Sequence, residues 1–196
     1  MNTWDNLYSN KKHQSIWPFT KIVSFVNKFY KKKKAKVLEI GSGYGANIPF
    51  FLHKKFDYYG LDYSKVALNF LKKKFTKIKK KLFLINLEED QILLKKFDLI
   101  IDRGCLVHIR KKYLKKVINK LHDSLNKNGI LISTDLISKK SNDFMEWKKI
   151  GANSLTEIEI RKLFYNWSIV YFEKVKTKNL KQKKSNTLFN IVVKKK

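Results

Sequence analysis

Apolar segments and amphipathic helical segments alternate along most of this chain. Apolar runs predict five strands, at residues 37–40, 57–61, 81–85, 97–101 and 129–134. Helices are predicted at residues 46–54, 64–75 and 111–125. The last has a clear helical period and is expected to end at Asn128-Gly129. Strands that alternate with helices at this spacing predict a parallel, doubly wound sheet.

The C-terminal part departs from this alternation. Thr156 and Glu159 have capping-box spacing, which predicts a helix to about Phe164. Residues 167–174 and 187–193 then read as strands. The connection 175–186 is polar without a helical stripe, whereas parallel neighbours need a crossover that is normally helical. We therefore expect an α/β fold of the Rossmann-like, doubly wound type. Its sheet has seven mostly parallel strands, a C-terminal antiparallel hairpin and helices on both faces.

Residues 16–30 predict a further helix ahead of the sheet, with Pro18 in its first turn. The length of 196 residues suits a single domain. The only cysteine, Cys105, allows no disulfide within the chain, which fits a reducing compartment. No apolar run approaches the roughly 20 residues of a membrane span, and the N-terminus lacks a signal-peptide pattern. We expect a soluble, cytoplasmic protein.

The charge balance changes this picture only in part. Lys and Arg number 44 against 16 Asp and Glu, a formal net charge of +28 that would suit nucleic acid or an anionic membrane. Only three of the 44 are arginines, and the lysines are spread through almost every segment. Nucleic-acid sites usually use Arg for its bidentate geometry. A coding bias that fills solvated positions with Lys and a genuine polyanion partner both stay open.

The segment that follows the first strand reads Glu39-Ile40-Gly41-Ser42-Gly43-Tyr44-Gly45. Glycines allow a sharp turn and let backbone N–H groups approach a ligand. A P-loop would place Lys-Ser or Lys-Thr after its last glycine, where this chain has Ala46-Asn47. Asp62 ends the second strand about twenty residues on, where a carboxylate can accept both ribose hydroxyls. A structural turn and a helix-capping aspartate are the alternative interpretations.

These residues, from about Val37 to the C-terminus, resemble the class I S-adenosylmethionine-dependent methyltransferases. The glycine segment is similar to the first motif of that family, and Asp62 to its second. Residues 97–102 resemble its fourth-strand motif, and residues 125–131 the entry to its fifth strand. The terminal hairpin is also typical of the family. The resemblance implies S-adenosylmethionine as cofactor and the following cofactor-binding residues: Glu39, Gly41, Ser42, Gly43, Gly45, Asp62, Tyr63, Asn86, Leu87, Asp102 and Arg103. No metal site is expected.

One position departs from the family pattern. After the third strand the family often has Asp to accept a hydrogen bond from the adenine amino group, and this chain has Asn86. An Asn carbonyl can accept the same bond, and Glu88 is the nearest substitute.

Candidates for the chemical step follow the fourth strand. His108 is the candidate general base, since it titrates nearest neutrality, although a histidine with a purely structural role is an alternative. Arg103 could hold an anionic substrate or pair with Asp102, and Asp135 could orient a substrate amine or cap a loop. Cys105 is interpreted as a packed residue rather than a nucleophile.

The resemblance also suggests where the acceptor lies. Leading helices often form a lid in this family, so we expect residues 1–34 to be a helical lid and 35–196 the methyltransferase domain, in one compact unit. The aromatics Trp4, Tyr8 and Trp17 could instead clamp the sheet. Residues 138–153, with Phe144 and Trp147, are expected to build the acceptor pocket.

The predicted function is methyl transfer to a small-molecule acceptor, because the chain has no room for a separate recognition domain. The alternatives are an RNA or other polyanion-associated methyltransferase, and a non-catalytic cofactor-binding scaffold. The sequence gives no oligomeric state.

Overall fold

The computed structural model describes residues 3–10, 14–93, 95–142, 144–179 and 184–196. Its strands are β1 (Lys36–Ile40), β2 (Asp57–Asp62), β3 (Leu82–Leu84), β4 (Phe97–Arg103), β5 (Leu125–Ile137), β6 (Trp167–Asn179) and β7 (Lys184–Lys195). Its helices are α1 (Thr3–Ser9), α2 (Thr20–Phe29), α3 (Ile48–His53), α4 (Lys65–Lys74), α5 (Lys111–Ser124), α6 (Phe144–Lys148) and α7 (Glu157–Leu163), with short 3₁₀ turns η1 (Thr76–Lys81) and η2 (Leu106–His108). None of these helices is long and apolar enough to cross a membrane.

The described strands form one seven-stranded sheet in the order β3-β2-β1-β4-β5-β7-β6. The first five are parallel, whereas β7 is antiparallel to both β5 and β6. The predicted fold class is confirmed. Because the chain leaves β1 toward β2 on one side and returns to β4 on the other, the order reverses between β1 and β4. In open α/β sheets ligands bind at the carboxyl ends of the strands on either side of such a switch.

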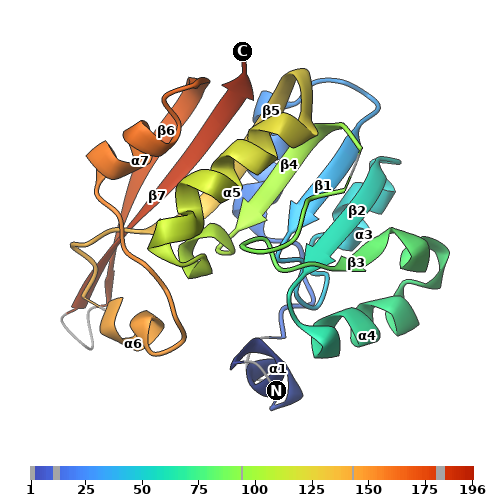
Figure 1. The fold of residues 1–196 in the computed structure, drawn as a ribbon, viewed down its shortest axis with the longest axis horizontal. Coiled ribbons are helices and arrows are strands. Elements are labelled where there is room, and N and C mark those ends of the chain that lie inside the picture. Colours follow the sequence, from blue (N-terminus) through green and yellow to red (C-terminus); the bar gives the residue numbers. More distant parts are fainter. Residues whose placement is uncertain (1–2, 11–13, 94, 143, 180–183) are drawn as a thin grey trace.

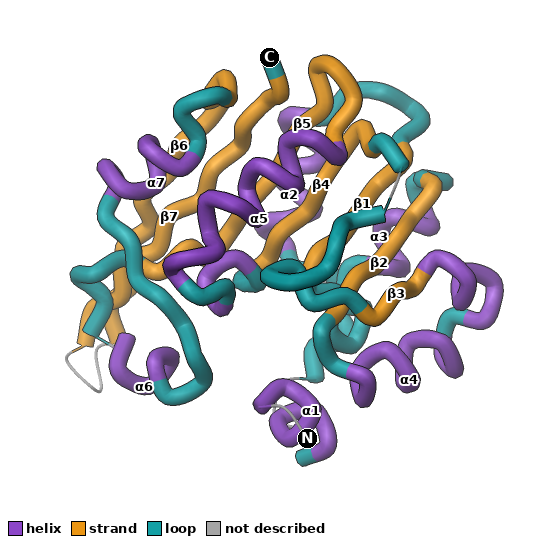
Figure 2. The backbone as a smooth tube through the Cα atoms, in the orientation of Figure 1, coloured by secondary structure: helices purple, strands orange, loops and turns teal. Residues whose placement is uncertain are grey.

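Helices cover both faces of the sheet because the strand residues are apolar on both faces. Leu38, Ile100 and Leu131 pack against α5 and α7, and their sequence neighbours Val37, Leu99 and Ile132 pack against α2, α3 and α4. Figure 1 shows α5 in front of the sheet, and Figure 2 shows α2 behind it. The apolar side chains packed on the two faces of the sheet hold the parallel strands rigidly. This packing fixes the positions of the carboxyl ends of the strands.

Two predicted helix boundaries are wrong. The helix predicted from residue 16 begins at Thr20, because Phe19 is extended and donates its N–H to Asn47 Oδ1, 3.0 Å away, instead of joining a helical turn. The helix predicted to end at Asn128-Gly129 ends at Ser124. Leu125, 1% exposed, is already paired with Phe97 of β4. The helix therefore ends before the Asn-Gly pair, which lies in an irregularity of β5: Asn128 has a φ of +63°, and the pairing with β4 passes from Leu125 directly to Ile130.

The C-terminal hairpin is confirmed but is longer than predicted. Strand pairing continues from Lys174–Phe189 out to Asn179–Lys184, through most of the polar stretch expected to be a connection. Backbone hydrogen bonds hold this extension, so no apolar pattern marks it in the sequence. Residues 180–183 of the predicted connection lie outside the described residues. The capping box at Thr156 and Glu159 is present as predicted.

Gly45 packs the loop after β1 against α3 and α4. Its φ is +74°, in the left-handed region. A Cβ atom here would lie 2.6 Å from Leu71 Cδ2 and 2.7 Å from Ile48 Cδ1. Gly45 therefore adopts a left-handed backbone and leaves room for Leu71 and Ile48. A residue with a side chain could do neither without strain.

Replacing Gly45 with Ala should lower the free energy of unfolding by about 2 kcal/mol or more, because the left-handed backbone and the clash in the core both oppose folding. Gly104 is a matched control, since its φ is +68° and its Cβ would meet nothing within 4 Å. Gly104→Ala should cost only about 1 kcal/mol, from the backbone alone. Urea unfolding measures both variants. Equal losses would contradict the packing role of Gly45.

Candidate active site

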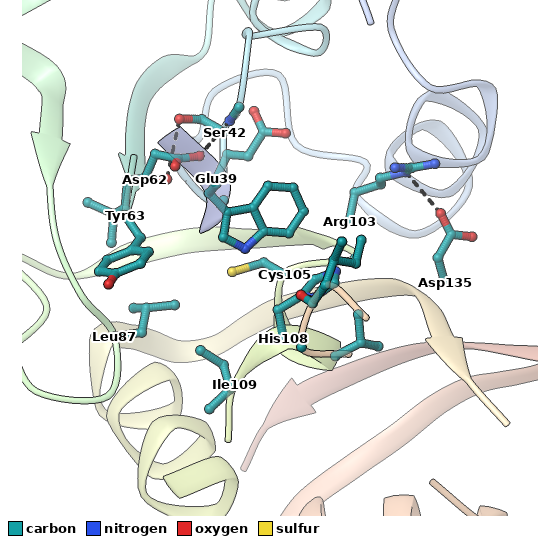
Figure 3. Close-up of a pocket in the computed structure, with 18 of the residues that line it drawn as sticks. Glu39, Ser42, Asp62, Tyr63, Leu87, Arg103, Cys105, His108, Ile109 and Asp135 are labelled. Atoms are coloured by element: carbon teal, nitrogen blue, oxygen red, sulfur yellow. Dashed lines mark hydrogen bonds and ion pairs between the residues drawn. The ribbon is translucent and has the colours of Figure 1, made fainter. Parts of the chain in front are cut away.

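A cavity of about 1130 Å³ opens at the carboxyl ends of β1, β2 and β4. This volume lies just above the roughly 300–1,000 Å³ typical of ligand sites. Figure 3 shows Glu39 and Asp62 on one side of the cavity and Arg103 with Asp135 on the other. Most residues predicted to bind cofactor line it, namely Glu39, Gly41, Ser42, Gly43, Asp62, Tyr63, Asn86, Leu87 and Arg103. Gly45 and Asp102 do not.

The glycine loop turns sharply between β1 and α3. Gly41 and Gly43 have φ of +66° and +51°. A Cβ on Gly41 would lie 2.6 Å from Cys105 Cβ, and one on Gly43 would lie 2.8 Å from Tyr8 Oη. The Ser42 N–H donates to the Leu61 carbonyl at 2.9 Å, which ties the loop to the end of β2. The loop is therefore enclosed by β2, by the residues after β4 and by the N-terminal helix.

Glu39 is buried, 3% exposed, at the base of this loop. Asn47 Nδ2 donates to Glu39 Oε1 at 2.7 Å, and the Tyr58 hydroxyl donates to Oε2 at 2.6 Å. Burial raises the pKa of Glu39 to about 7, against the opposing effect of these two hydrogen bonds. The partners Asn47 and Tyr58 were not predicted. Only the folded chain places them beside Glu39.

Asp62 closes the loop from the β2 side. Its Oδ2 accepts the Gly43 N–H at 2.7 Å and its Oδ1 accepts the Ser64 N–H at 2.8 Å. Burial raises its pKa to about 6, although these N–H groups favour the ionised form. Each carboxylate oxygen can accept more than one hydrogen bond, so Asp62 can hold the loop and also face the cavity.

The third strand leads into the next part of the wall. Asn86 Oδ1 accepts the Glu88 N–H at 3.1 Å. Glu88, 7% exposed, accepts from the Arg110 backbone N–H at 2.6 Å and from Arg110 Nε at 2.5 Å. Both candidates for the adenine contact thus line the cavity. The Glu88 carboxylate is already paired with Arg110, a partner that no motif in the sequence indicates.

The N-terminal helix α1 covers this end of the cavity. Asp5 accepts the Ser64 hydroxyl at 2.6 Å and the Val66 N–H at 3.2 Å, so it attaches α1 to the start of α4. Tyr8 packs edge-on against Tyr44 of the loop, with ring centroids 5.0 Å apart. Trp4 also lines the cavity, whereas Trp17 is 76% exposed. Sequence reasoning missed Asp5, because its partners lie almost sixty residues away.

The residues after β4 form the opposite wall. Asp102 is fully buried and accepts hydrogen bonds from Ser133 Oγ at 2.6 Å and from the Cys105 N–H at 2.8 Å. These hydrogen bonds hold the turn between β4 and η2 in place. Burial raises the pKa of the Cys105 thiol well above its ordinary value, which fits a packed residue rather than a nucleophile.

Arg103 forms an ion pair with Asp135, with 2.9 Å between Nε and Oδ2, and not with Asp102 as one of the expectations had it. His108 lines the cavity next to Trp4, with ring centroids 4.7 Å apart, and its Nδ1 lies 3.2 Å from the Ile150 carbonyl oxygen. In the stretch predicted to build the acceptor pocket, Trp147 and Ile150 line the cavity but Phe144 does not.

Charge is distributed unevenly between this cavity and the rest of the chain. No lysine among the described residues lines it, although lysine is the main source of the net charge of +28. Five of the sixteen acidic residues do line it: Glu39, Asp62, Glu88, Glu89 and Asp135. Arg110 and Arg103 pair with the last three of these. The uncompensated carboxylates, Glu39 and Asp62, are thus concentrated at the glycine loop, where a cationic ligand would be favoured.

Residues 38–131 match a family model described as a methyltransferase domain. No curated protein matches the sequence. The fold is similar to that of the N-methyltransferase NodS from Bradyrhizobium japonicum in complex with S-adenosylhomocysteine, with a TM-score of 0.73, 14% identity, and coverage of 100% of this chain and 99% of that one.

Two further structures share the fold. An N-methyltransferase from Haemonchus contortus in complex with phosphomonomethylethanolamine and S-adenosylhomocysteine has a TM-score of 0.77 and 14% identity, covering 98% of this chain and 59% of that one. The magnesium protoporphyrin IX methyltransferase of Synechocystis, with bound S-adenosylmethionine, has a TM-score of 0.61 and 19% identity, covering 87% and 76%. With its strand order, glycine loop and matched domain, the chain is similar to the class I S-adenosylmethionine-dependent methyltransferases.

Proposed function

We propose that this enzyme transfers the methyl group to a small-molecule acceptor inside the cavity under α1. The observation that carries the proposal is the charge distribution. A polyanion needs a track of cationic groups, whereas no lysine among the described residues lines the cavity and its two arginines are paired with carboxylates. Relatives in fold named for small acceptors, such as the Synechocystis porphyrin enzyme, support the same choice.

The lining residues fit S-adenosylmethionine. The cofactor carries an ammonium and a sulfonium, and the uncompensated carboxylates Glu39 and Asp62 lie at the glycine loop. Asp62 would accept the ribose hydroxyls and Asn86 the adenine amino group, with Leu87 and Tyr63 packing beside them. When bound, the cofactor supplies an electrophilic methyl group. The chain itself mainly has to align the acceptor and exclude water, which can supply roughly 7–11 kcal/mol of the barrier.

The two acceptor classes can be separated directly. Methyl-labelled S-adenosylmethionine is incubated with the protein and either the low-molecular-mass fraction of a cell extract or total RNA. Label should enter the small-molecule fraction and persist at high salt. Label that enters RNA, together with RNA binding that weakens steeply with salt, would instead establish the polyanion alternative.

We propose that the lid over this site is the part of residues 1–34 that precedes α2. The part carried by α1 is supported by the contacts of Asp5 with the start of α4 and of Tyr8 with Tyr44. The helix α2 acts differently, since Ile22, Phe25 and Val26 are buried in the core against the sheet. Residues 1–2 and 11–13 of the lid lie outside the described residues.

We propose His108 as the general base for an acceptor that begins protonated. A carbonyl oxygen can only accept, so Nδ1 donates to Ile150, and in the neutral ring Nε2 is the basic nitrogen. His108→Gln should lower kcat by roughly 10²–10⁴-fold while S-adenosylhomocysteine affinity stays within about twofold. Unchanged kcat would show that the acceptor needs no base or that His108 is not the one.

Asp62→Asn should weaken S-adenosylhomocysteine binding by about tenfold or more, because an amide cannot accept both hydroxyls and the loop N–H groups as a carboxylate does. Calorimetry measures the affinity. Asp123→Asn is the matched control, since the Asp123 side chain is 79% exposed on α5. An unchanged affinity in Asp62→Asn would contradict this placement of the cofactor.

The affinity should also depend on pH. The pKa of Asp62 is about 6 before the ligand binds, and accepting hydroxyl hydrogen bonds favours its ionised form. Binding therefore requires loss of a proton at low pH, so the affinity is constant well above pH 6 and falls about tenfold between pH 7 and pH 5. Titration of the buried Glu39, with a pKa of about 7, would steepen the same fall. Affinity that rises on acidification would contradict the assignment.

A further inference from the structure

Arg103 is the cationic side chain at the end of the cavity away from Glu39 and Asp62 (Figure 3). Its guanidinium carbon lies 3.9 Å from the ring centroid of Phe19, so the aromatic ring holds the guanidinium plane. Asp135 pairs with it through Nε. A guanidinium has five N–H donors, and among the described residues Asp135 is the only acceptor paired with Arg103. The Nη atoms of Arg103 can therefore donate hydrogen bonds to a ligand.

Asp135 is held in a conformation that costs free energy. Its φ is +62°, in the left-handed region, and the pairing of β5 with β7 shifts register between Ser133 and Leu136, on either side of it. Such backbone strain is typically of order 1–3 kcal/mol and persists only where the surroundings enforce it. The irregularity lets the Asp135 carboxylate reach Arg103 at the edge of the cavity.

Asn190 of β7 enforces this conformation. It is 2% exposed, and its Oδ1 accepts the Asp135 N–H at 3.0 Å. Its Nδ2 donates to Glu173 Oε2 of β6 at 2.8 Å, and Glu173 in turn pairs with Lys21 of α2 at 3.1 Å. A polar chain thus runs from α2 through β6 and β7 to the pair at the cavity. An ion pair that only links two surface side chains would not need this chain of polar contacts.

We propose that Arg103 binds an anionic oxygen group, a carboxylate or a phosphate, on the methyl acceptor, and that Asp135 and Asn190 are positioning residues for it. This rests on the proposed methyl transfer to a small molecule. Asp135 fixes the orientation of the guanidinium without blocking its Nη side, which is the geometry for bidentate recognition of an anion. The net charge of +28 would steer a small anion toward the site, whereas it would repel a cationic acceptor.

Binding of matched probes to the S-adenosylhomocysteine-loaded protein tests this without knowledge of the natural acceptor. Benzoate, phenyl phosphate and neutral benzamide suit a cavity that Phe19 and Trp147 both line. Calorimetry should show at least one anion bound about tenfold or more tighter than benzamide, and the preferred anion distinguishes a carboxylate from a phosphate site. Arg103→Met should abolish that preference. Arg161→Met, which removes an exposed arginine paired with Glu157 on α7, should keep it.

The positioning role has its own readout. Asn190→Leu should reduce the preference for the anion over benzamide while S-adenosylhomocysteine affinity stays within about twofold, a pattern that general destabilisation would not give. The proposal is overturned if wild type binds none of the probes, binds benzamide as tightly as both anions, or if Arg103→Met keeps the preference. Failure of wild type to bind S-adenosylhomocysteine would instead refute the proposed function itself.

Discussion

The hydrogen bond from the Gly43 N–H to the Asp62 carboxylate joins the ends of β1 and β2, and the cavity depends on it. The glycine loop leaves the sheet at the end of β1, so it needs a contact that holds it beside the end of β2. Asp62 does this from a buried position, with a raised pKa as the cost. The same carboxylate lines the cavity. In the cofactor placement that we propose, loop geometry and ligand recognition are therefore coupled through one group.

Carboxylates are stabilised differently at the two ends of the cavity. At the glycine loop, Glu39 and Asp62 are held by neutral donors rather than by a cation, which suits a cationic cofactor that favours their ionised forms. At the other end Asp135 is compensated by Arg103. The chain thus separates its charges over a short distance, while its lysines lie outside the described lining. This separation would let one cavity take the cationic cofactor together with the anionic acceptor that we propose.

The large positive charge now has a simpler explanation than its size suggested. Lysines on α4 and α5 lie on exposed positions opposite the buried stripes of those helices, as solvated residues do. Their field still acts at a distance, since net charge changes the rate at which small ions arrive. It does not require a nucleic-acid partner. Composition alone could not distinguish solvated surface lysines from a polyanion-binding site, because it does not say where in the fold the lysines lie.

The alternation of strands and helices, the glycine turn, Asp62 and the closing hairpin could all be predicted from the amino-acid sequence. These depend on local periodicity, on backbone freedom and on spacing along the chain, which are all readable from neighbouring residues. Other features appear only in the folded chain: Arg103 pairs with Asp135, Asp5 attaches α1 to α4, and Asn190 supports a strained backbone. The fold also leaves Asp102 and Gly45 out of the cavity lining. The reason is physical: these contacts join residues that are distant in sequence, and burial and strand register bring them together.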